Sequence, residues 1–534
     1  MKRSRSSALM RKLVPLHLGE ENAMEHQEPK QNELRTTQNA GANQGAEGPS
    51  LRHKVTTGLF WTYAERILAQ IVTTVVSLVL ARLLSPDDYG AISLVMVFIS
   101  ICEVFVTSGF GNALVQKRDA DALDFSSIFY FSMFLAALLY GVLFAAAPFV
   151  AGFYRSEILC PVLRVLGVRL LLSSFNSIQR AYISKHMAFR KFFRATVIGT
   201  VISAFVGIGL ALIGFGVWAL VGQYLTNSLF DTVILFFSID WRPKRMLSLE
   251  RLKGLVSYGW KLLASSLIET VYYNLRSLVI GKLFSEADLA FYDKGRHFPE
   301  IIALNANSPI TAVIFPAIAN VQDDRERVRM LTRRSIRVSI YIMCPLLMGM
   351  AAIAEPLVQV LLTDKWLPCV PYLQIACFNC LIIPINTANL QPVMALGRSD
   401  LYLKLEIIKK VVGISILLGT VVCFRSVIAI AVGTMVNSVL ELIINSSQNK
   451  KLFGYSLLEE LRDILPTLLL GMGMSAVVLL IGRLELPAAA LLALQIAAGA
   501  AMYLGVSYLV RMESFVYILD IIKGLLAKKR AEKN

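Results

Sequence analysis

The chain has 534 residues, 56% of them hydrophobic, and a mean hydropathy of +0.60. Its formal net charge is +16 at pH 7, which in a soluble protein would suggest a nucleic-acid-binding surface. Here the basic residues follow the connections between apolar segments. We therefore expect no nucleic acid partner and attribute the charge to membrane topology and to contacts with membrane lipids.

The first 52 residues differ from the rest of the chain in being polar, with a Gln/Asn/Gly-rich stretch at residues 38–48. They contain no apolar core long enough for a cleavable signal peptide. Their composition predicts a disordered cytoplasmic extension over residues 1–52. Met24 is an alternative candidate for the start of translation.

About fourteen apolar segments follow, most of them long enough to cross the ~30 Å hydrocarbon layer as helices. They are too long and too continuous for the strands of a membrane barrel. The segments cover approximately residues 57–84, 90–115, 125–152, 158–181, 190–213, 216–238, 255–284, 288–320, 335–363, 370–396, 401–423, 425–448, 461–482 and 486–511. The sequence therefore predicts an all-α integral membrane protein with about 14 transmembrane helices.

Basic residues concentrate on alternate connections between these segments. Groups of them occur at residues 117–118, 180–194, 242–253, 325–337 and 450–451 and in the C-terminal tail, whereas the intervening connections hold isolated cations. Lys and Arg resist translocation, so the basic side is expected to be cytoplasmic. An even number of spans then places both termini in the cytoplasm.

A repeat relates the first apolar segment to the seventh. Residues Leu78–Tyr89 align without gaps on Leu278–Leu289, and in both copies an apolar run ends in a basic residue, two apolar residues, Ser and acidic residues. Six spans separate the copies, which predicts a parallel repeat; a chance likeness of two helix ends is the alternative. We expect an N-terminal six-helix lobe (55–238), a cytoplasmic linker (239–254), a C-terminal six-helix lobe (255–449), two additional helices (450–515) and a basic cytoplasmic tail (516–534).

Three segments carry polar residues although a charge at the bilayer centre costs ~2.5–3.5 kcal/mol. Spacings of three and four residues place each set on one helix face. The sets are Arg66, Gln70, Thr73 and Ser77; Glu269, Tyr272, Tyr273 and Arg276; and Asp293, Arg296, His297 and Glu300, with Asn307 farther along. Because these segments are repeat-related or consecutive, we expect the three faces to converge on a hydrated cavity between the lobes.

An alternative interpretation is that such charges form ion pairs that only lock helices together. Other polar sets are weaker indications of a cavity. They are Glu103 alone in the second segment; Arg169, Ser173, Asn176 and Arg180 in the fourth; Gln223, Asn227 and Asp231 in the sixth; and Glu406, Lys409 and Lys410 in the eleventh. Glu103 is a candidate proton carrier or an ion-pair partner, and the eleventh-segment set is typical of snorkelling side chains.

Motifs for soluble catalysis are missing from the sequence. No P-loop or dinucleotide fingerprint is present, and no catalytic triad falls in a polar domain. The seven cysteines lie in or beside apolar segments, and none forms a zinc-spaced group with one of the five histidines. We therefore expect a transporter without ATPase motif, cofactor or metal, and no enzyme.

Several short motifs resemble one family of transporters. They are Gly58–Trp61, Leu80–Gly90, Gly109–Gln116, Phe291–Asp293, Ile314–Gln322, Lys365-Trp366 and Ala395–Asp400. In this order the motifs are similar to bacterial lipopolysaccharide/colanic-acid-type polysaccharide flippases of the multidrug/oligosaccharidyl-lipid/polysaccharide exporter superfamily, over roughly residues 55–515. The chain departs from the family pattern at Asp293-Lys294, where small or uncharged residues are commoner, and this bears on the glycan preferred.

The resemblance implies translocation of an undecaprenyl-diphosphate-linked oligosaccharide across the inner membrane by alternating access, for lipopolysaccharide or exopolysaccharide synthesis. Arg66, Arg276 and Arg296 are then candidates to bind phosphate or acidic sugars, and Tyr272 and Tyr273 to face sugar rings. Gln70, Glu269 and Asn307 complete the expected lining, and Glu269, His297 and Glu300 are ion-coupling candidates. A coupling ion, either a proton or sodium, and glycan polymerases are candidate partners.

Two other functions stay open. An ion-coupled drug or cation antiporter of related architecture would favour a cavity of carboxylates and aromatic residues, and the arginines argue against it. A membrane glycan polymerase or ligase would need a substantial external loop, whereas every external connection here is short.

Overall fold

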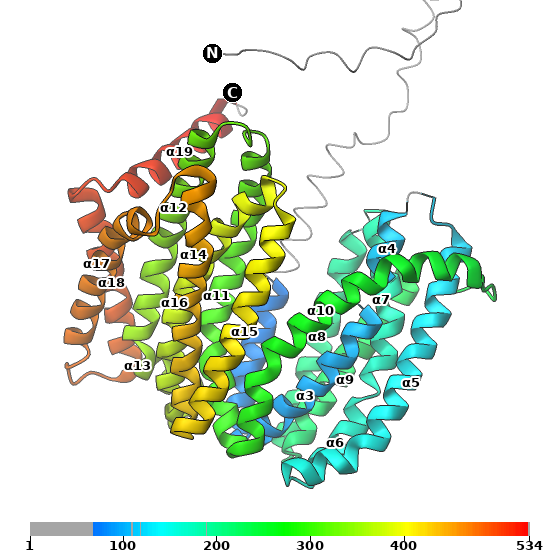
Figure 1. The fold of residues 1–534 in the computed structure, drawn as a ribbon. Coiled ribbons are helices and arrows are strands. Elements are labelled where there is room, and N and C mark those ends of the chain that lie inside the picture. The colour runs from blue at the N-terminus through cyan, green and yellow to red at the C-terminus, as the bar shows by residue number, and fades with distance from the viewer. Residues whose placement is uncertain (1–67, 108–109, 118, 188, 532–534) are drawn as a thin grey trace, which may run out of the picture. The chain divides into compact units, whose positions relative to one another are not determined.

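The structure is a computed structural model that describes residues 68–107, 110–117, 119–187 and 189–531. Within these ranges every regular element is a helix (Figure 1). The expected N-terminal extension, the Gly58–Trp61 motif and the candidate Arg66 lie outside the described residues.

The helices follow one another with short connections. The first are Leu68–Leu83, α3 (Pro86–Thr107), α4 (Phe110–Gln116), α5 (Ala122–Tyr154), α6 (Leu159–Leu166), α7 (Arg169–Lys185), α8 (Phe189–Leu212), α9 (Val217–Ser238) and α10 (Leu249–Leu283). They continue with α11 (Glu286–Ala319), α12 (Arg325–Ala352), α13 (Ala354–Leu362), the 3₁₀ helix η1 (Asp364–Cys369), α14 (Val370–Ala395), α15 (Ser399–Phe424), α16 (Val427–Phe453), α17 (Leu457–Ile481), α18 (Ala488–Leu509) and α19 (Glu513–Ala531).

Eleven helices within the described ranges are long and apolar enough to span a membrane. The all-α integral membrane class is thereby confirmed, and the chain is a multi-pass membrane protein. The predicted spans without such a helix are the first, described only as Leu68–Leu83, and the seventh and eighth, which correspond to α10 and α11 and carry many charges. The number of fourteen stays a prediction.

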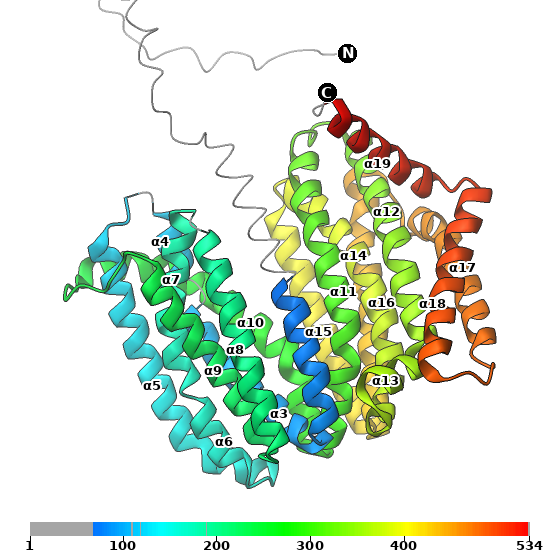
Figure 2. The same cartoon turned by 180° about the vertical axis from the view of Figure 1, so that it is seen from behind.

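The helices pack in two groups, seen from opposite sides in Figures 1 and 2. In the N-terminal group, defined here as α3–α9, each helix contacts others of the same group. In the C-terminal group, defined as α11–α18, α14 packs against α11, α12 and α16, and α17 joins α12 to α18. Apolar side chains such as Leu80, Leu163, Leu347 and Leu373 are fully buried in the cores of this arrangement.

Each repeat copy attaches the end of its first helix to the opposite group. Arg82 donates from Nε to the carbonyl oxygen of Leu361 at 2.9 Å, at the end of α13. The aligned Lys282, in the last turn of α10, donates from Nζ to the carbonyl oxygen of Phe153 at 2.5 Å, at the end of α5. Both cations thus meet free carbonyls at a helix C-terminus, where the helix dipole favours positive charge. These matching contacts fit the predicted parallel repeat.

The attachment of each copy's first helix to the opposite group also bears on the predicted boundary between the two lobes. α10 was expected to open the C-terminal lobe, yet it packs mainly against α3, α4 and α5. The Leu68–Leu83 helix instead binds the C-terminal group, where the indole nitrogen of Trp366 donates to the carbonyl oxygen of Ala81 at 2.8 Å. The predicted domain boundaries themselves stay a prediction.

The second helices of the two copies cross each other at their starts. Ser85 and Ser285 cap α3 and α11, and each hydroxyl lies 2.7 Å from the carboxylate three residues later, Asp88 or Asp288. A Cβ at Gly90 would lie 1.9 Å from the carbonyl oxygen of Glu286. Only glycine therefore permits this crossing.

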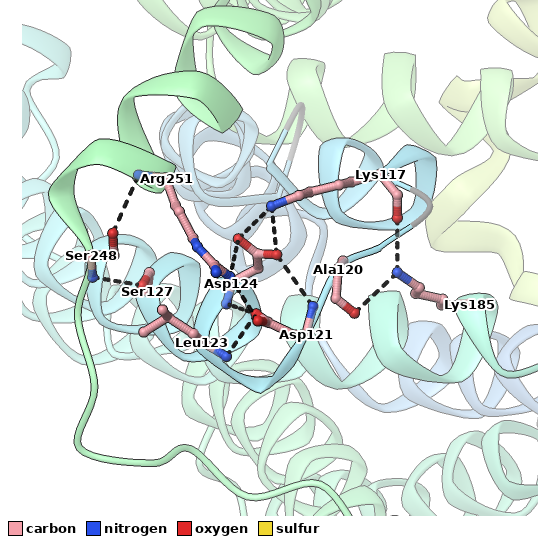
Figure 3. A network of polar contacts seen from close by, with 9 residues as sticks. All are labelled: Lys117, Ala120, Asp121, Leu123, Asp124, Ser127, Lys185, Ser248 and Arg251. Atoms are coloured by element: carbon pink, nitrogen blue, oxygen red, sulfur yellow. Dashed lines mark hydrogen bonds and ion pairs between the residues drawn. The ribbon is translucent and has the colours of Figure 1, made fainter.

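A polar network fixes the start of α10 to the N-terminal group (Figure 3). Fully buried Asp124 binds Lys117 at 2.6 Å, and Arg251 of α10 binds Asp121 at 2.7 Å. Lys185 of α7 adds hydrogen bonds to the carbonyl oxygens of Lys117 and Ala120. The hydrogen bond from Arg251 lowers the pKa of Asp121 to about 2. Helices α4, α5, α7 and α10 thus meet in one cluster at the end that the charge pattern predicts to be cytoplasmic.

Candidate substrate cavity

A cavity of about 590 Å³, lined by charged and hydroxyl-bearing side chains together with apolar ones, lies among α3, α9, α10 and α11. It contains residues from both repeat copies, since α3 follows the first copy and α11 the second. Its volume lies within the range of ligand sites, roughly 300–1,000 Å³. The predicted convergence of polar faces is thus present for α10 and α11, and α3 supplies the facing wall.

The two opposing walls use aligned positions of the repeat. α11 contributes Asp293, Arg296, His297 and Glu300, and α3 contributes Ser93, Met96, Val97 and Ser100, which lie 200 positions earlier. The same helix face of each copy therefore lines the cavity. The α11 wall is charged, whereas the aligned α3 wall is uncharged, so the cavity is electrically asymmetric.

Arg296 is the guanidinium on the charged wall. Its Nε and Nη2 atoms donate to Oε1 of Glu300 at 2.9 and 2.7 Å, and the hydroxyl of Tyr273 donates to the other carboxylate oxygen at 2.9 Å. The guanidinium carbon lies 5.2 Å from the ring centre of Tyr273 and 5.0 Å from that of Tyr292. Two charge-assisted hydrogen bonds to one carboxylate oxygen and the packing on two aromatic rings hold Arg296 in one orientation.

Uncharged hydrogen-bonding groups complete the lining. The hydroxyl of Ser277 donates to Asp293 at 3.2 Å, and the amide of Asn274 lies 3.5 Å from the hydroxyl of Ser100. Tyr224 of α9 also faces the cavity. Sequence reasoning did not single out Ser93, Ser100 or Asn274, although the repeat alignment places the two serines opposite Asp293 and Glu300.

The structure divides the predicted site residues between the cavity and other places. Tyr273, Arg296, His297 and Glu300 line the cavity, as does Glu269, which also binds Lys410 of α15 at 2.9 Å. Asn307 instead donates to Thr387 of α14 at 3.0 Å. Gln70 donates weakly to Thr74 in the next turn of its own helix, at 3.4 Å.

Tyr272 and Arg276 lie on the face of α10 that is turned toward α15. A Cβ at Gly413 of α15 would lie 1.9 Å from the Tyr272 hydroxyl oxygen, and Lys410 lies 4.0 Å from the centre of the Tyr272 ring. Arg276 packs on the same ring at 5.3 Å and has no ion pair among the described residues. Of the three predicted arginines, Arg296 alone is therefore placed on the cavity lining by the described residues.

Lys294, the second residue of the departure from the family pattern, does not line this cavity. It is buried, donates to Ser77 at 2.8 Å and lies 4.2 Å from the ring centre of Tyr89. It therefore holds the Leu68–Leu83 helix against α11. Asp293 is the residue of this pair that changes the charge of the cavity.

The fold resembles that of known multi-helix membrane transporters. The structure superposes with a TM-score of 0.67 on "Lipid II flippase MurJ, inward closed conformation", at 13% identity over 85% of this chain and 99% of that chain. A multidrug resistance MATE family transporter of the MOP superfamily, in an inward-facing conformation, gives a TM-score of 0.54 at 14% identity over 72% of this chain and 95% of that chain. The chain thus shares the fold of these membrane proteins.

The sequence comparison then gives the family. The family model for polysaccharide biosynthesis proteins matches residues 79–371, more than half of the chain, and the chain belongs to that family. It is 23% identical over 357 residues to the teichuronic acid biosynthesis protein TuaB of Bacillus subtilis, covering 66% of this chain and 74% of that protein. It is 24% identical over 368 residues to the lipopolysaccharide biosynthesis protein WzxC of Escherichia coli, covering 67% and 74%. The resemblance noted in the sequence is confirmed.

Proposed function

We propose that this protein moves an undecaprenyl-diphosphate-linked oligosaccharide across the bacterial inner membrane, for lipopolysaccharide or exopolysaccharide synthesis. The observation that carries the proposal is the polar cavity between the two repeat copies, in a member of a polysaccharide biosynthesis family. A relative named as a succinoglycan biosynthesis transport protein, ExoT of Rhizobium meliloti, and the structural neighbour named as a lipid II flippase support the same class of substrate. Sugar hydroxyls and a diphosphate need such a polar path through hydrocarbon.

Alternating access fits the way the two groups are joined. Arg82 and Lys365 attach the Leu68–Leu83 helix and the link after it to the C-terminal group, and Lys282 attaches α10 to the N-terminal group, in each case through hydrogen bonds to backbone carbonyls. These contacts lie at the two links through which the chain crosses from one group to the other. Such bonds can be exchanged for water at modest cost, about 1 kcal/mol each. The charge pattern assigns this end to the external side and both termini to the cytoplasm.

Arg296 and Glu300 supply a way to couple substrate binding to protons. In the present arrangement the carboxylate of Glu300 occupies two donors of Arg296. A proton on Glu300 removes its negative charge and frees the guanidinium for a phosphate oxygen. Glu269 and His297 line the same cavity and are the other coupling candidates.

The test is a flipping assay in proteoliposomes with a synthetic, fluorescently labelled undecaprenyl-diphosphate trisaccharide. We expect the purified protein to expose the label to an external quencher faster than protein-free liposomes do. Arg296→Met should slow this at least about tenfold, since a charge-assisted bidentate contact is worth ~1.5–3 kcal/mol. Arg483→Met, at an exposed arginine between α17 and α18 that does not line the cavity, is the matched control and should change the rate little.

Proton coupling is tested by imposing a pH gradient on the same liposomes. Wild-type transport should respond to the gradient, and Glu300→Gln should not. Equal rates with and without the protein would overturn the proposed function. Transport of a lipophilic cation such as ethidium, without transport of the trisaccharide lipid, would favour the antiporter alternative.

A further inference from the structure

A second polar cavity lies within the N-terminal group, among α3, α4, α7 and α9, and encloses about 420 Å³. Its lining brings together the three polar sets that the sequence left unassigned: Glu103 of the second span, the stripe on α7, and Asn227 and Asp231 of α9. Two carboxylates, two guanidiniums, two amides and five hydroxyls face this space. We call it the N-terminal pocket.

The charges of the N-terminal pocket are already paired with each other. Arg169 Nε lies 3.1 Å from Glu103 Oε1, and Arg180 Nη2 lies 3.3 Å from Asp231 Oδ2. Ser173 also donates to Glu103 at 2.8 Å, and Arg180 donates to Asn176 at 2.8 Å. An entering diphosphate would face two carboxylates and no unpaired cation of this lining, so the pocket favours an uncharged ligand.

The pocket retains free hydrogen-bonding capacity. Of the serines that line it, Ser184 and Ser228 have no side-chain hydrogen bond to another described residue. The Ser177 side chain faces the same space. An uncharged ligand with many hydroxyl groups satisfies acceptors and donors of this kind without adding charge.

The N-terminal pocket adjoins the candidate substrate cavity along two shared helices. Ser100 lines the cavity and Glu103 the pocket, a separation of ~4.5 Å along α3. Tyr224 and Asn227 have the same relation on α9. Arg169 lies at the junction, because it pairs with Glu103 and also contacts Met96 of the cavity wall at 3.6 Å and the Tyr224 ring at 5.8 Å.

We propose that the N-terminal pocket binds uncharged sugar residues of the lipid-linked substrate, while the diphosphate stays in the cavity beside Arg296. This inference rests on the proposed function and assigns the glycan end of the substrate to one half of the protein. The volume of 420 Å³ falls in the range of ligand sites, roughly 300–1,000 Å³. Arg169 then lies between the part of the site that holds the diphosphate and the part that holds the sugar residues.

The experiment measures binding to the purified full-length protein by native mass spectrometry. The probes are undecaprenyl diphosphate and undecaprenyl diphosphate carrying a trisaccharide of uncharged hexoses. Ser177→Leu combined with Ser228→Leu fills the pocket without touching either ion pair. We expect about tenfold weaker binding of the trisaccharide probe, corresponding to one or two lost hydrogen bonds, and unchanged binding of undecaprenyl diphosphate.

The matched control is Ser415→Leu combined with Ser447→Leu, two exposed serines of α15 and α16 that line neither the cavity nor the N-terminal pocket, and it should leave both affinities unchanged. Equal binding of the trisaccharide probe by the double variant and the wild type would overturn the inference alone. Failure of the wild type both to bind this probe and to move it in liposomes would overturn the proposed function as well.

A second measurement avoids the bulky substitutions. Ser184→Cys, an exposed position on the pocket lining, is made in a Cys423→Ala background, because Cys423 is the exposed native cysteine of the described chain. The trisaccharide probe should slow reaction of this cysteine with a water-soluble maleimide, and undecaprenyl diphosphate should not. Equal labelling rates with both probes would contradict a sugar in the pocket.

Discussion

The N-terminal and C-terminal groups use the polar residues of corresponding helices in different ways. On α7 and α9 these residues surround a cavity of about 420 Å³, whereas the corresponding space among α11, α14 and α16 is about 20 Å³. Farther along α14 and α16 the amides pair directly: Asn386 with Asn445 at 3.0 Å, and Asn389 with Asn449 at 2.8 Å. One half has an open polar pocket, and the other is fastened by amide hydrogen bonds.

This difference suggests separate roles for the two sets of polar residues, ligand binding for the N-terminal set and stability of the fold for the C-terminal set. Amides at seven- and ten-residue spacing along α14 match partners on α16, and each bond satisfies one donor and one acceptor, while Oδ1 of Asn445 and of Asn449 stays without a partner among the described residues. The polar side chains of the N-terminal pocket are partly satisfied among themselves and leave space between them. We therefore expect substitutions in the C-terminal amide set to destabilise the fold, and substitutions in the N-terminal pocket to affect ligands.

The largest effect should come from the crossing of α3 and α11, where the two halves carry different residues. Gly90→Leu places side-chain atoms where the backbone of Glu286 already lies, so we expect little folded protein. Ala290, the aligned residue of the second copy, is buried, and Ala290→Gly should cost only about 1 kcal/mol. Detergent-solubilised yield and thermal unfolding measure both; normal yield of the leucine variant would contradict the close crossing.

The next effect tests the amide set directly. Asn389→Ala removes the donor to fully buried Glu460, at 2.7 Å, and the acceptor for Asn449. Stranding a buried carboxylate and an amide should cost about 2–3 kcal/mol of unfolding free energy. The matched variant Asn227→Ala, in the N-terminal pocket, loses only two long contacts of 3.4 Å and should cost less than about 1 kcal/mol. Equal losses in chemical denaturation would remove the distinction between the two halves.

A smaller effect is expected at the two repeat-related cations. Arg82→Ala loses hydrogen bonds to two carbonyl oxygens at the end of α13, those of Leu361 and Val360, whereas Lys282→Ala loses one at the end of α5. Because both side chains are exposed, each change should cost about 1 kcal/mol or less. If these hydrogen bonds must break when the cavity opens to the other side of the membrane, both variants should also flip the substrate faster than the wild type. Slower flipping in either variant, at normal stability, would argue against that role.

The class of fold could be predicted from the sequence because hydropathy and charge alternation act over whole segments. The charged face of α11 was predictable for the same reason: Arg296, His297 and Glu300 recur at helical spacing and all face the cavity. The face of α10 that lines the cavity could not be predicted in this way. The polar residues of α10 lie on two sides of the helix. Tyr273 contacts Glu300 of α11, whereas Tyr272 contacts Lys410 of α15.

The N-terminal pocket could not be predicted from spacing alone. Glu103, Arg169 and Asp231 are far apart in sequence, and their pairing depends on how α3, α7 and α9 pack. From the sequence, Glu103 was a candidate proton carrier or ion-pair partner, and the sets that contain Arg169 and Asp231 were weaker indications. The amide set of α14 and α16 was missed for the opposite reason, since single uncharged amides in apolar segments give little signal until both helices are in place.

The smallest effect concerns the ion networks at the predicted cytoplasmic end, where the two groups again differ. Asp463 of α17 is buried and binds Arg333 and Arg337, whereas Asp121 of the Figure 3 network is half exposed and binds Arg251. The folded-state pKa of Asp121, about 2, lies below its ordinary value of 3.8. The stabilisation it provides is therefore complete above pH 4 and is lost as the pH falls from about 4 to about 2.

Asp121→Asn should thus lower the thermal unfolding temperature slightly at pH 6 and less at pH 3. Asp240→Asn, with a side chain that is 95% exposed, should change neither value. A deficit for Asp121→Asn that stays the same at both pH values would mean that Asp121 stabilises the protein through its cap bonds at the start of α5 rather than through its charge on Arg251 of α10.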